Sequence, residues 1–277
     1  MPFTFAERLT VCDLCEGTEF FVRDERAKIV QCRRCGYRFV NPRPTQEEIA
    51  RSYSAPQQYD LWLSQDAGRR VTWRKRWDLV KRYANGNRLL DIGAGIGSFL
   101  AAAKADGWDV TGTEISTSAI EIAHRLYSID LIRGQIEDIP LESRFDVVTM
   151  WHVLEHVPSP SRNLRIAREL MSDDGLLVVA VPNDSDARWR FQRLKNGTYA
   201  PYEELREGAE IHLSQFTVPV LRKVLESNGF TIQRMTVDDH YAEPTPRSDR
   251  LVSLYRGLMA LTGVNLAVAT LALAKAS

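Results

Sequence analysis

The stretch LLDIGAGIGSFL at residues 89–100 joins a short apolar run to a glycine-rich turn and then to an apolar helical segment. Residues 88–92 are typical of a buried strand, and Gly93, Gly95 and Gly97 follow in a G-x-G-x-G pattern. Glycines at a strand-to-helix turn let the backbone approach a ligand, while the first turn of the helix offers N–H groups. The pattern predicts a nucleotide-type α/β fold whose loop binds a small ligand.

Two carboxylates indicate the kind of ligand. Asp91 lies inside the predicted strand, and Glu114 lies 23 residues further on, at the end of the next strand. A carboxylate in the position of Asp91 repels a pyrophosphate but attracts a positively charged amino group, and an acid at the tip of the second strand can bind ribose hydroxyls. S-adenosylmethionine has an amino group and no phosphate, so the charges favour it over a dinucleotide.

Five stretches resemble, in order, the successive motifs of class I S-adenosylmethionine-dependent methyltransferases. They are LLDIGAGIGSFL, VTGTEIS (110–116), RGQIEDIPL (133–141), FDVVTMWHVLEHVPSP (145–160) and RELMSDDGLLVVAVPN (168–183). The resemblance implies a Rossmann-like α/β domain over residues 88–277, with seven strands in the order 3-2-1-4-5-7-6. It also implies that the protein transfers a methyl group.

The same resemblance implies which residues bind the cofactor. They lie at or near the carboxyl ends of the first four strands of this domain: Asp91, Gly93, Gly95, Glu114, Ile115, Ile136, Glu137, Met150 and His152. Asp91 would face the methionine end, Glu114 the ribose and Ile115 the adenine. Ile115 and Ile136 would also fit ordinary core positions.

The fourth motif contains H-x-x-E-H, from His152 to His156, which is also one signature of zinc peptidases. A peptidase needs this motif inside a long helix, but Pro158 and Pro160 end any helix within two turns. At the end of a strand in a doubly wound sheet, the same side chains face a ligand. We therefore expect Glu155 and His156 to face the methyl acceptor.

Three residues are candidates for catalysis: His156, His212 and Glu155. Methyl transfer requires that the acceptor be positioned and lose its proton, and a histidine suits proton removal from a hydroxyl near neutral pH. His212 lies near the end of an expected lid insertion at about 184–215.

A second metal site is the alternative role of these residues. Small-RNA 2′-O-methyltransferases carry E-x-x-E-H at the corresponding place plus a later histidine, and they bind a divalent ion; some quinone-pathway O-methyltransferases are similar. Here His152 replaces the first glutamate, so the resemblance implies a ligand set of His152, Glu155, His156 and His212. Three imidazoles and a carboxylate suit zinc, iron or manganese better than magnesium.

All four cysteines lie in the first 35 residues, in the pattern C-x2-C-x16-C-x2-C: Cys12, Cys15, Cys32 and Cys35. This spacing is typical of a tetrathiolate zinc site, whereas a redox dithiol needs only one pair. A ribbon at residues 1–41 cannot bury much core, so we expect a structural zinc. Cysteines confined to such a site and an N-terminus without a signal pattern predict a cytoplasmic protein.

Residues 42–87 would form a helical linker. Within it, residues 68–84 carry seven Lys and Arg among apolar residues, which fits an amphipathic helix with a solvated cationic side or a basic face for a phosphorylated acceptor. The apolar stretch 257–273 is short for a membrane span and fits a helix end, a turn and a buried final strand. With 36 basic and 36 acidic residues, no overall field favours nucleic acid or an anionic membrane.

The sequence predicts a methyltransferase that uses S-adenosylmethionine to methylate an oxygen of a small molecule or glycan. The ribbon followed by NPRP at 41–44 resembles a bacterial subgroup that accompanies polysaccharide or secondary-metabolite pathways. Two alternatives remain open. One is an RNA-directed methyltransferase that uses the ribbon and the basic helix as its footprint. The other is a catalytically inactive partner subunit that binds the cofactor.

Overall fold

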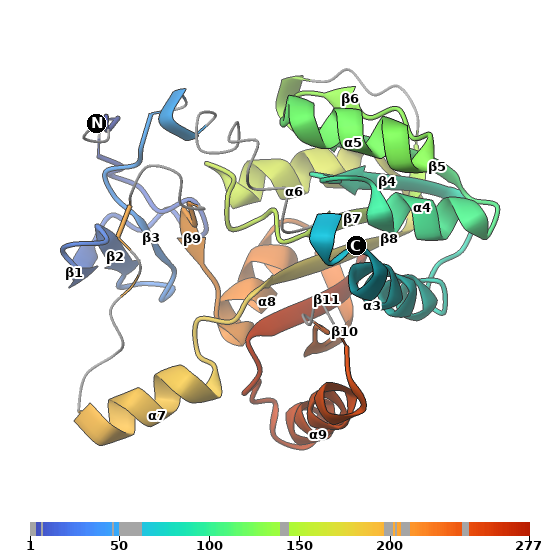
Figure 1. Ribbon diagram of the computed structural model, residues 1–277. Coiled ribbons are helices and arrows are strands. Elements are labelled where there is room, and N and C mark those ends of the chain that lie inside the picture. The colour runs from blue at the N-terminus through green and yellow to red at the C-terminus, as the bar shows by residue number, and fades with distance from the viewer. Residues whose placement is uncertain are drawn as a thin grey trace.

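Strand β4 (Arg88–Ile92) lies inside a seven-stranded sheet (Figure 1). The computed structural model describes residues 4–6, 8–45, 47–49, 63–138, 144–196, 202, 204–205, 211–239 and 244–277. Across the sheet the strands are β6 (Ile132–Arg133), β5 (Asp109–Glu114), β4, β7 (Phe145–Trp151), β8 (Met171–Pro182), β11 (Ala269–Ala276) and β10 (Phe230–Val237). Neighbours are parallel from β6 to β8, and β11 is antiparallel to β8 and β10. Counted along this domain, the order is 3-2-1-4-5-7-6, which confirms the expected fold.

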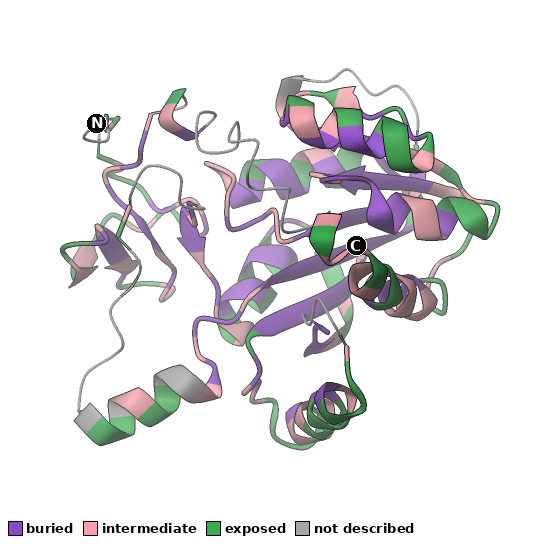
Figure 2. Ribbon diagram, viewed as in Figure 1, coloured by how far each residue is buried: buried purple, intermediate pink, exposed green. Residues whose placement is uncertain are grey.

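Helices cover both faces of this sheet. On one face lie α3 (Asp66–Val80), α4 (Ser98–Ala105) and α5 (Thr117–Tyr127), and on the other lie α6 (Pro160–Glu169) and α8 (Val218–Ser227). The inner strands are therefore buried on both sides, as Figure 2 shows. This explains why LLVVAV at 176–181 in β8 is apolar without alternation.

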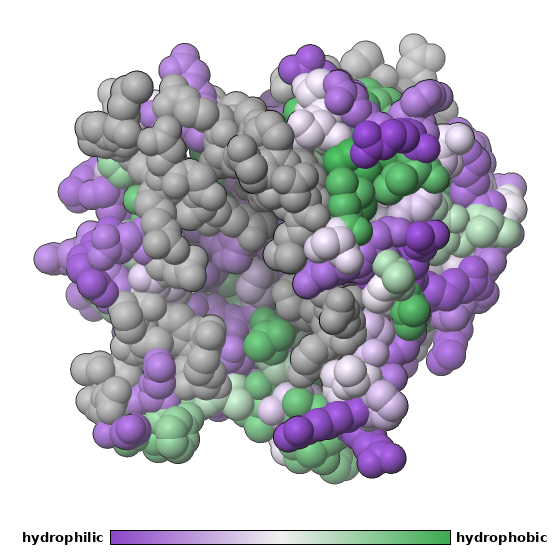
Figure 3. All heavy atoms as spheres, viewed as in Figure 1, coloured by the Kyte–Doolittle hydropathy of each residue, from purple (hydrophilic) through white to green (hydrophobic). Residues whose placement is uncertain are grey.

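The C-terminal part of the chain completes the sheet. Helix α9 (Pro246–Thr262) packs on β10 through Val252 and Met259, and the chain turns at Gly263 before it enters the buried strand β11. This confirms the expected helix end, turn and final strand. None of the helices in the described ranges is long and apolar enough to cross a membrane. On the face drawn in Figure 3, hydrophobic side chains form small separate patches between hydrophilic ones.

The cysteine-bearing segment forms a second sheet that is shared with the larger domain. Strands β1 (Phe20–Asp24), β2 (Ile29–Cys32) and β3 (Arg38–Val40) are antiparallel, and β9 (Ser214–Gln215) adds a fourth strand beside β3. In Figure 1, β9 therefore connects the blue N-terminal sheet to the rest of the molecule. The segment is built into the fold rather than attached by a linker alone.

Helix α3 lies where the basic helix was expected, but its cationic side is not simply solvated. Arg74 binds Asp106 at 2.7 Å, and Lys75 binds Asp249 at 2.6 Å. Arg76 is only 6% exposed and is paired with the buried Asp238. The expectation of a solvated side is wrong for Arg76, because aspartates from distant segments neutralise this helix.

The expected lid region, about 184–215, is described in part. It contains helix α7 (Ala187–Asn196), which extends away from the sheet at the lower left of Figure 1. Residues 197–201, 203 and 206–210 of this region lie outside the described residues.

Candidate functional site

The glycine turn after β4 has the backbone geometry that its sequence predicts. Gly93, Gly95 and Gly97 all have positive φ, at 67°, 55° and 77°. At Gly93 a Cβ atom would lie 2.7 Å from a methyl carbon of Val153, so a side chain would not fit between this turn and the H-x-x-E-H segment. The turn thus lies directly beside that segment, at the carboxyl edge of the sheet.

Asp91 is buried under this turn at 2% exposure. Its carboxylate accepts a hydrogen bond from Thr149 Oγ1 at 2.6 Å. Burial raises the pKa of Asp91 to about 7, an effect only partly offset by the hydrogen bond from Thr149. A cationic group placed here would stabilise the ionised carboxylate, which is the chemistry that the sequence predicted.

Glu114 at the end of β5 is also buried, at 8% exposure. One carboxylate oxygen accepts a hydrogen bond from the backbone N–H of Gly95 at 2.8 Å, and the other accepts from Ile115 and Ser116 at 2.8 and 2.9 Å. Burial raises the pKa of Glu114, and these three hydrogen bonds oppose that effect. The carboxylate therefore ties the glycine turn to the tip of β5, while Ile115 is half-buried beside it.

The other expected cofactor contacts occupy two different environments. Ile136 and Glu137 lie in the short 3₁₀ helix η2 (Ile136–Asp138), where Ile136 is buried in the main core and Glu137 accepts a hydrogen bond from Asn163 Nδ2 at 2.6 Å. Met150 is fully buried within β7. His152 is the first residue after this strand.

The H-x-x-E-H residues form a turn, not a helix. His152 has a φ of 56°, and helix α6 begins only at Pro160. The two histidines therefore do not lie on one helical face, and the geometry of a zinc peptidase is excluded.

Glu155 lies at the centre of this turn with 1% exposure. Within the described part of the chain, no group donates a hydrogen bond to either carboxylate oxygen. Nδ1 of His152 lies 3.4 Å and Nε2 of His156 lies 3.9 Å from its Oε1 atom. Burial opposes ionisation of Glu155, but the neighbouring imidazoles outweigh burial and lower its pKa. Glu155 is therefore a buried carboxylate whose ionised form is stabilised by the neighbouring imidazoles.

His156 and His212 meet beside Glu155. His156 Nδ1 lies 2.7 Å from the backbone oxygen of Ile211, and because a carbonyl oxygen only accepts, Nδ1 is the donor. When the ring is neutral, Nε2 therefore carries the lone pair. The two rings meet edge to face at 69° with centroids 4.8 Å apart, and one ligand atom from each of Glu155, His156 and His212 lies within 4.8 Å of the others. The structure brings together the three residues expected to be catalytic.

His152 contacts Glu155 but is not part of this three-residue cluster, and its other ring nitrogen contacts a residue that sequence reasoning missed. Its Nε2 lies 3.2 Å from Asp238, a fully buried carboxylate that also accepts hydrogen bonds from Arg76. Burial lowers the pKa of His152, but Asp238 and Glu155 more than reverse this and raise it to about 9. Arg76 in turn lies over the rings of Trp73 and Trp151. The signals in the sequence were an arginine on the apolar side of a helix and the acidic pair at 238–239.

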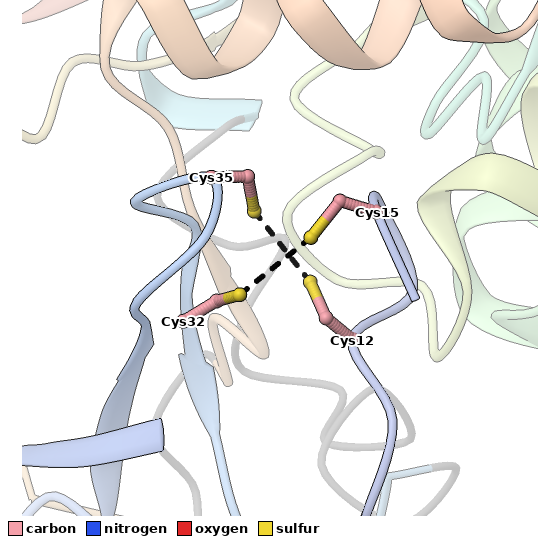
Figure 4. Close-up of side chains that lie close together, drawn as sticks. All are labelled: Cys12, Cys15, Cys32 and Cys35. Atoms are coloured by element: carbon pink, nitrogen blue, oxygen red, sulfur yellow. Dashed lines mark hydrogen bonds between the residues drawn. The ribbon is translucent and has the colours of Figure 1, made fainter. Parts of the chain in front are cut away.

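The four cysteines form a separate cluster (Figure 4). The Sγ atoms of Cys12 and Cys35 are 3.6 Å apart, as are those of Cys15 and Cys32. Four thiolates around a tetrahedral zinc, with Zn–S bonds of about 2.3 Å, give S–S distances of about 3.8 Å. The cluster fits the structural zinc that the spacing predicted.

Hydrogen bonds connect the ribbon to the start of α6 and, through Ser214, to the turn at residues 152–156, here called the histidine turn. Asp13, inside the first cysteine pair, accepts from the hydroxyl of Ser159 and from the backbone N–H of Ser161 at 3.0 Å, at the start of α6. Tyr37, on the other side of the ribbon, bonds the hydroxyl of Ser214 at 2.5 Å. Ser214 N–H then donates to the backbone oxygen of Glu155 at 3.0 Å. The ribbon thus supports both segments that carry the histidines.

Comparison with known proteins gives the same family that the motifs resemble. A family model described as a methyltransferase domain matches residues 65–234. Ubiquinone biosynthesis O-methyltransferase of Actinobacillus pleuropneumoniae is 32% identical over 122 residues, which are 39% of this chain and 52% of that protein. The mitochondrial ubiquinone biosynthesis O-methyltransferase of Schizosaccharomyces pombe is 36% identical over 104 residues, which are 35% of this chain and 38% of that protein. The chain thus spans about half or less of the length of these relatives.

A solved structure shares the fold over most of both chains. The magnesium protoporphyrin IX methyltransferase of Synechocystis, which has S-adenosylhomocysteine bound, matches with a TM-score of 0.55 and 17% identity. The match covers 84% of this chain and all of that one.

Proposed function

Because the chain belongs to the methyltransferase domain family, we propose that it transfers the methyl group of S-adenosylmethionine to an oxygen atom of a small molecule. The observation that carries the proposal is the position of two buried carboxylates, Asp91 and Glu114, on either side of a glycine turn that abuts the histidine turn. The cofactor and the acceptor would then meet at one edge of the sheet. The O-methyltransferase names of the relatives support oxygen as the acceptor atom.

The residues of this edge fit S-adenosylmethionine. Asp91 would bind the amino group, with Gly93 and Gly95 along the methionine, and Glu114 would accept from the ribose hydroxyls. Ile115, Ile136 and Glu137 would lie toward the adenine, and Met150 and His152 would support the reacting end. Bound there, the cofactor supplies an activated methyl group for in-line displacement.

His156 would remove the proton of the acceptor. Its Nδ1–H is fixed on the Ile211 carbonyl, so Nε2 is the atom that accepts the proton, and the ionised Glu155 at 3.9 Å stabilises the resulting charge. His212, whose ring lies beside that of His156, would help to position the acceptor.

A divalent metal held by Glu155, His156 and His212 is a second proposal for the same residues. The observation that favours it is the buried carboxylate of Glu155, whose oxygens accept no hydrogen bond from the described residues. A metal-bound His commonly donates its other N–H to a carbonyl oxygen, as His156 does here. His152, expected as a fourth ligand, is instead paired with Asp238, so this proposal rests on three ligands.

The ribbon would hold one structural zinc through Cys12, Cys15, Cys32 and Cys35. Four thiolates complete a tetrahedral shell and leave no position for a substrate. We further propose a cytoplasmic location, because thiolates that bind zinc require a reducing compartment.

Calorimetric titration with S-adenosylhomocysteine at two pH values tests the cofactor site. Asp91 must be ionised to bind the amino group, and its pKa is about 7, so affinity should rise about eightfold between pH 6 and pH 7.5. Asp91→Asn should abolish the rise and weaken binding. Asp109→Asn, which alters a 72% exposed side chain on β5, should do neither. A wild-type protein without measurable binding would overturn the proposal.

Methyl transfer from labelled cofactor into fractionated cell extracts separates the remaining alternatives. Label in a small-molecule fraction supports the proposal. Label in RNA, with salt-dependent RNA binding, would support the RNA-directed alternative, which the paired cations of α3 disfavour. Tight cofactor binding without transfer to any fraction would support an inactive partner subunit.

A further inference from the structure

Arg43 is a buried arginine held in a fixed place beside the ribbon sheet. It follows β3 between Pro42 and Pro44 and is 8% exposed. Its backbone oxygen accepts a hydrogen bond from the N–H of Ala6 at 2.8 Å, and Pro44 forms a bridge with Phe5. Two prolines and these contacts leave the backbone little freedom, so the side chain starts from a defined position.

The guanidinium of Arg43 lacks the partners that buried arginines need. Its carbon lies 6.0 Å from the centre of the Phe39 ring, and no described residue accepts a hydrogen bond from Nε or Nη2. Arg38 and Arg76, in the same molecule, are each paired with a buried aspartate, Asp184 and Asp238. A buried charge without hydrogen-bond partners is strongly unfavourable. Arg43 therefore has the chemistry of a site that is completed by an anion.

A chain of contacts connects Arg43 to the histidine turn. Its guanidinium lies over the ring of Phe39, and that ring stacks on the ring of Tyr37 with centroids 5.0 Å apart. The Tyr37 hydroxyl bonds Ser214, whose N–H bonds the backbone of Glu155. The glycine turn, by contrast, contacts the histidine turn at a different residue, Val153. An anion on Arg43 would belong to the acceptor rather than to the cofactor.

We propose that Arg43 binds an anionic group, a carboxylate or a phosphate, of the methyl acceptor. The planar guanidinium presents Nε and Nη2 side by side, which matches two oxygens of either group. The assignment of the anion to the methyl acceptor rests on the proposed function. The existence of an anion site at Arg43 does not depend on it. Thiolates bound to zinc would add negative charge to the ribbon. However, the cysteine sulfur atoms accept no hydrogen bond from Nε or Nη2 of Arg43.

Anion binding can be measured directly on the zinc-loaded full-length chain with S-adenosylhomocysteine present. Inorganic phosphate and benzoate are titrated separately by calorimetry, so that the tighter probe indicates a phosphate or a carboxylate acceptor. Arg43→Gln should weaken binding of the preferred probe about tenfold or more, because two charge-assisted hydrogen bonds are lost. Arg33→Gln, which removes a 62% exposed arginine from the same ribbon, should change it less than about twofold.

A thermal-melting comparison tests the same point when no anion is added. Arg43→Met should melt at the same temperature as the wild type or higher, whereas Arg38→Met should melt lower because it leaves Asp184 unpaired. Phosphate or benzoate should then raise the melting temperature of the wild type but not that of Arg43→Met.

Three results would overturn the inference. The wild type binds neither probe, or Arg43→Gln and Arg33→Gln bind equally well, or Arg43→Met loses zinc and melts lower than the wild type, which would make Arg43 structural. Binding of S-adenosylhomocysteine in the same samples keeps this failure distinct from a failure of the proposed function.

Discussion

The four cysteines and the group of Glu155, His156 and His212 are both clusters of potential metal ligands, but they are built differently. The cysteines come from two tight turns of one small sheet and their sulfur atoms surround a point at tetrahedral spacing. The other group comes from a turn after β7 and a distant segment before β9, and it supplies ligand atoms from only three residues. The first arrangement supplies a complete tetrahedral ligand set for a metal, whereas the second supplies one ligand fewer.

This difference predicts a structural role for a metal bound by the cysteines and a chemical role for Glu155, His156 and His212. The ribbon has a small core and would gain its stability from zinc. The histidine turn follows directly from strand β7 of the large sheet. It is also stabilised by the contact of His152 with Asp238 and by the hydrogen bond from Ser214 N–H to the backbone oxygen of Glu155. A metal there would add chemistry rather than stability.

The largest effect should come from removing one ligand of the closed cluster. Cys32→Ser should reduce zinc from about one per chain to near zero and unfold the ribbon, since structural zinc contributes on the order of 10 kcal/mol to folding. Elemental analysis measures the zinc, and hydrogen exchange in β1 to β3 measures the unfolding. Arg33→Gln, at the next position, should retain the metal. A ribbon that stays protected without zinc would contradict the idea that metal supports it.

Removing both imidazoles of the open cluster should affect catalysis more than folding. His156→Ala with His212→Ala should lower the rate of methyl transfer on the order of 10³-fold, because the proton acceptor is lost. Binding of S-adenosylhomocysteine should change less than about threefold. His124→Ala, in a 70% exposed position, is the matched control.

Metal content of the same double variant decides between the two proposals for this cluster. One zinc per chain in both the wild type and the variant would mean that only the cysteines bind metal and that His156 acts as a base. A second metal that disappears in the variant would establish Glu155, His156 and His212 as ligands.

The closed and open clusters were not equally predictable from the sequence. The cysteine spacing contains all four ligands within 24 residues, and the strand order followed from motifs that are local. Asp238 is 86 residues from His152 and 162 residues from Arg76, and no local pattern pairs them. The addition of β9 to the ribbon and the isolation of Arg43 likewise depend on long-range packing. Sequence patterns locate ligands; the contacts that orient them appear only in the folded chain.

Breaking the buried pair behind the open cluster should destabilise the whole domain. Asp238→Asn leaves Arg76 and His152 as neighbouring buried cations, so unfolding should require about 3 kcal/mol less free energy, as urea denaturation would measure. Asp249→Asn removes a 46% exposed partner of Lys75 and should cost less than about 1 kcal/mol. Equal effects in both variants would show that the buried network does not support the turn.

The smallest effect should come from uncoupling the two clusters while leaving both intact. Asp13→Asn keeps the four cysteines and the group of Glu155, His156 and His212. It removes the negative charge at the N-terminus of α6. We expect a loss of about 1 kcal/mol in stability, zinc content equal to that of the wild type, and methyl transfer slowed a few fold. Ser161→Ala, which removes the hydroxyl that donates to the Asp13 backbone, should act in the same direction but more weakly. If Asp13→Asn leaves the rate unchanged while stability falls, the ribbon supports α6 without positioning His156, and the two clusters function independently.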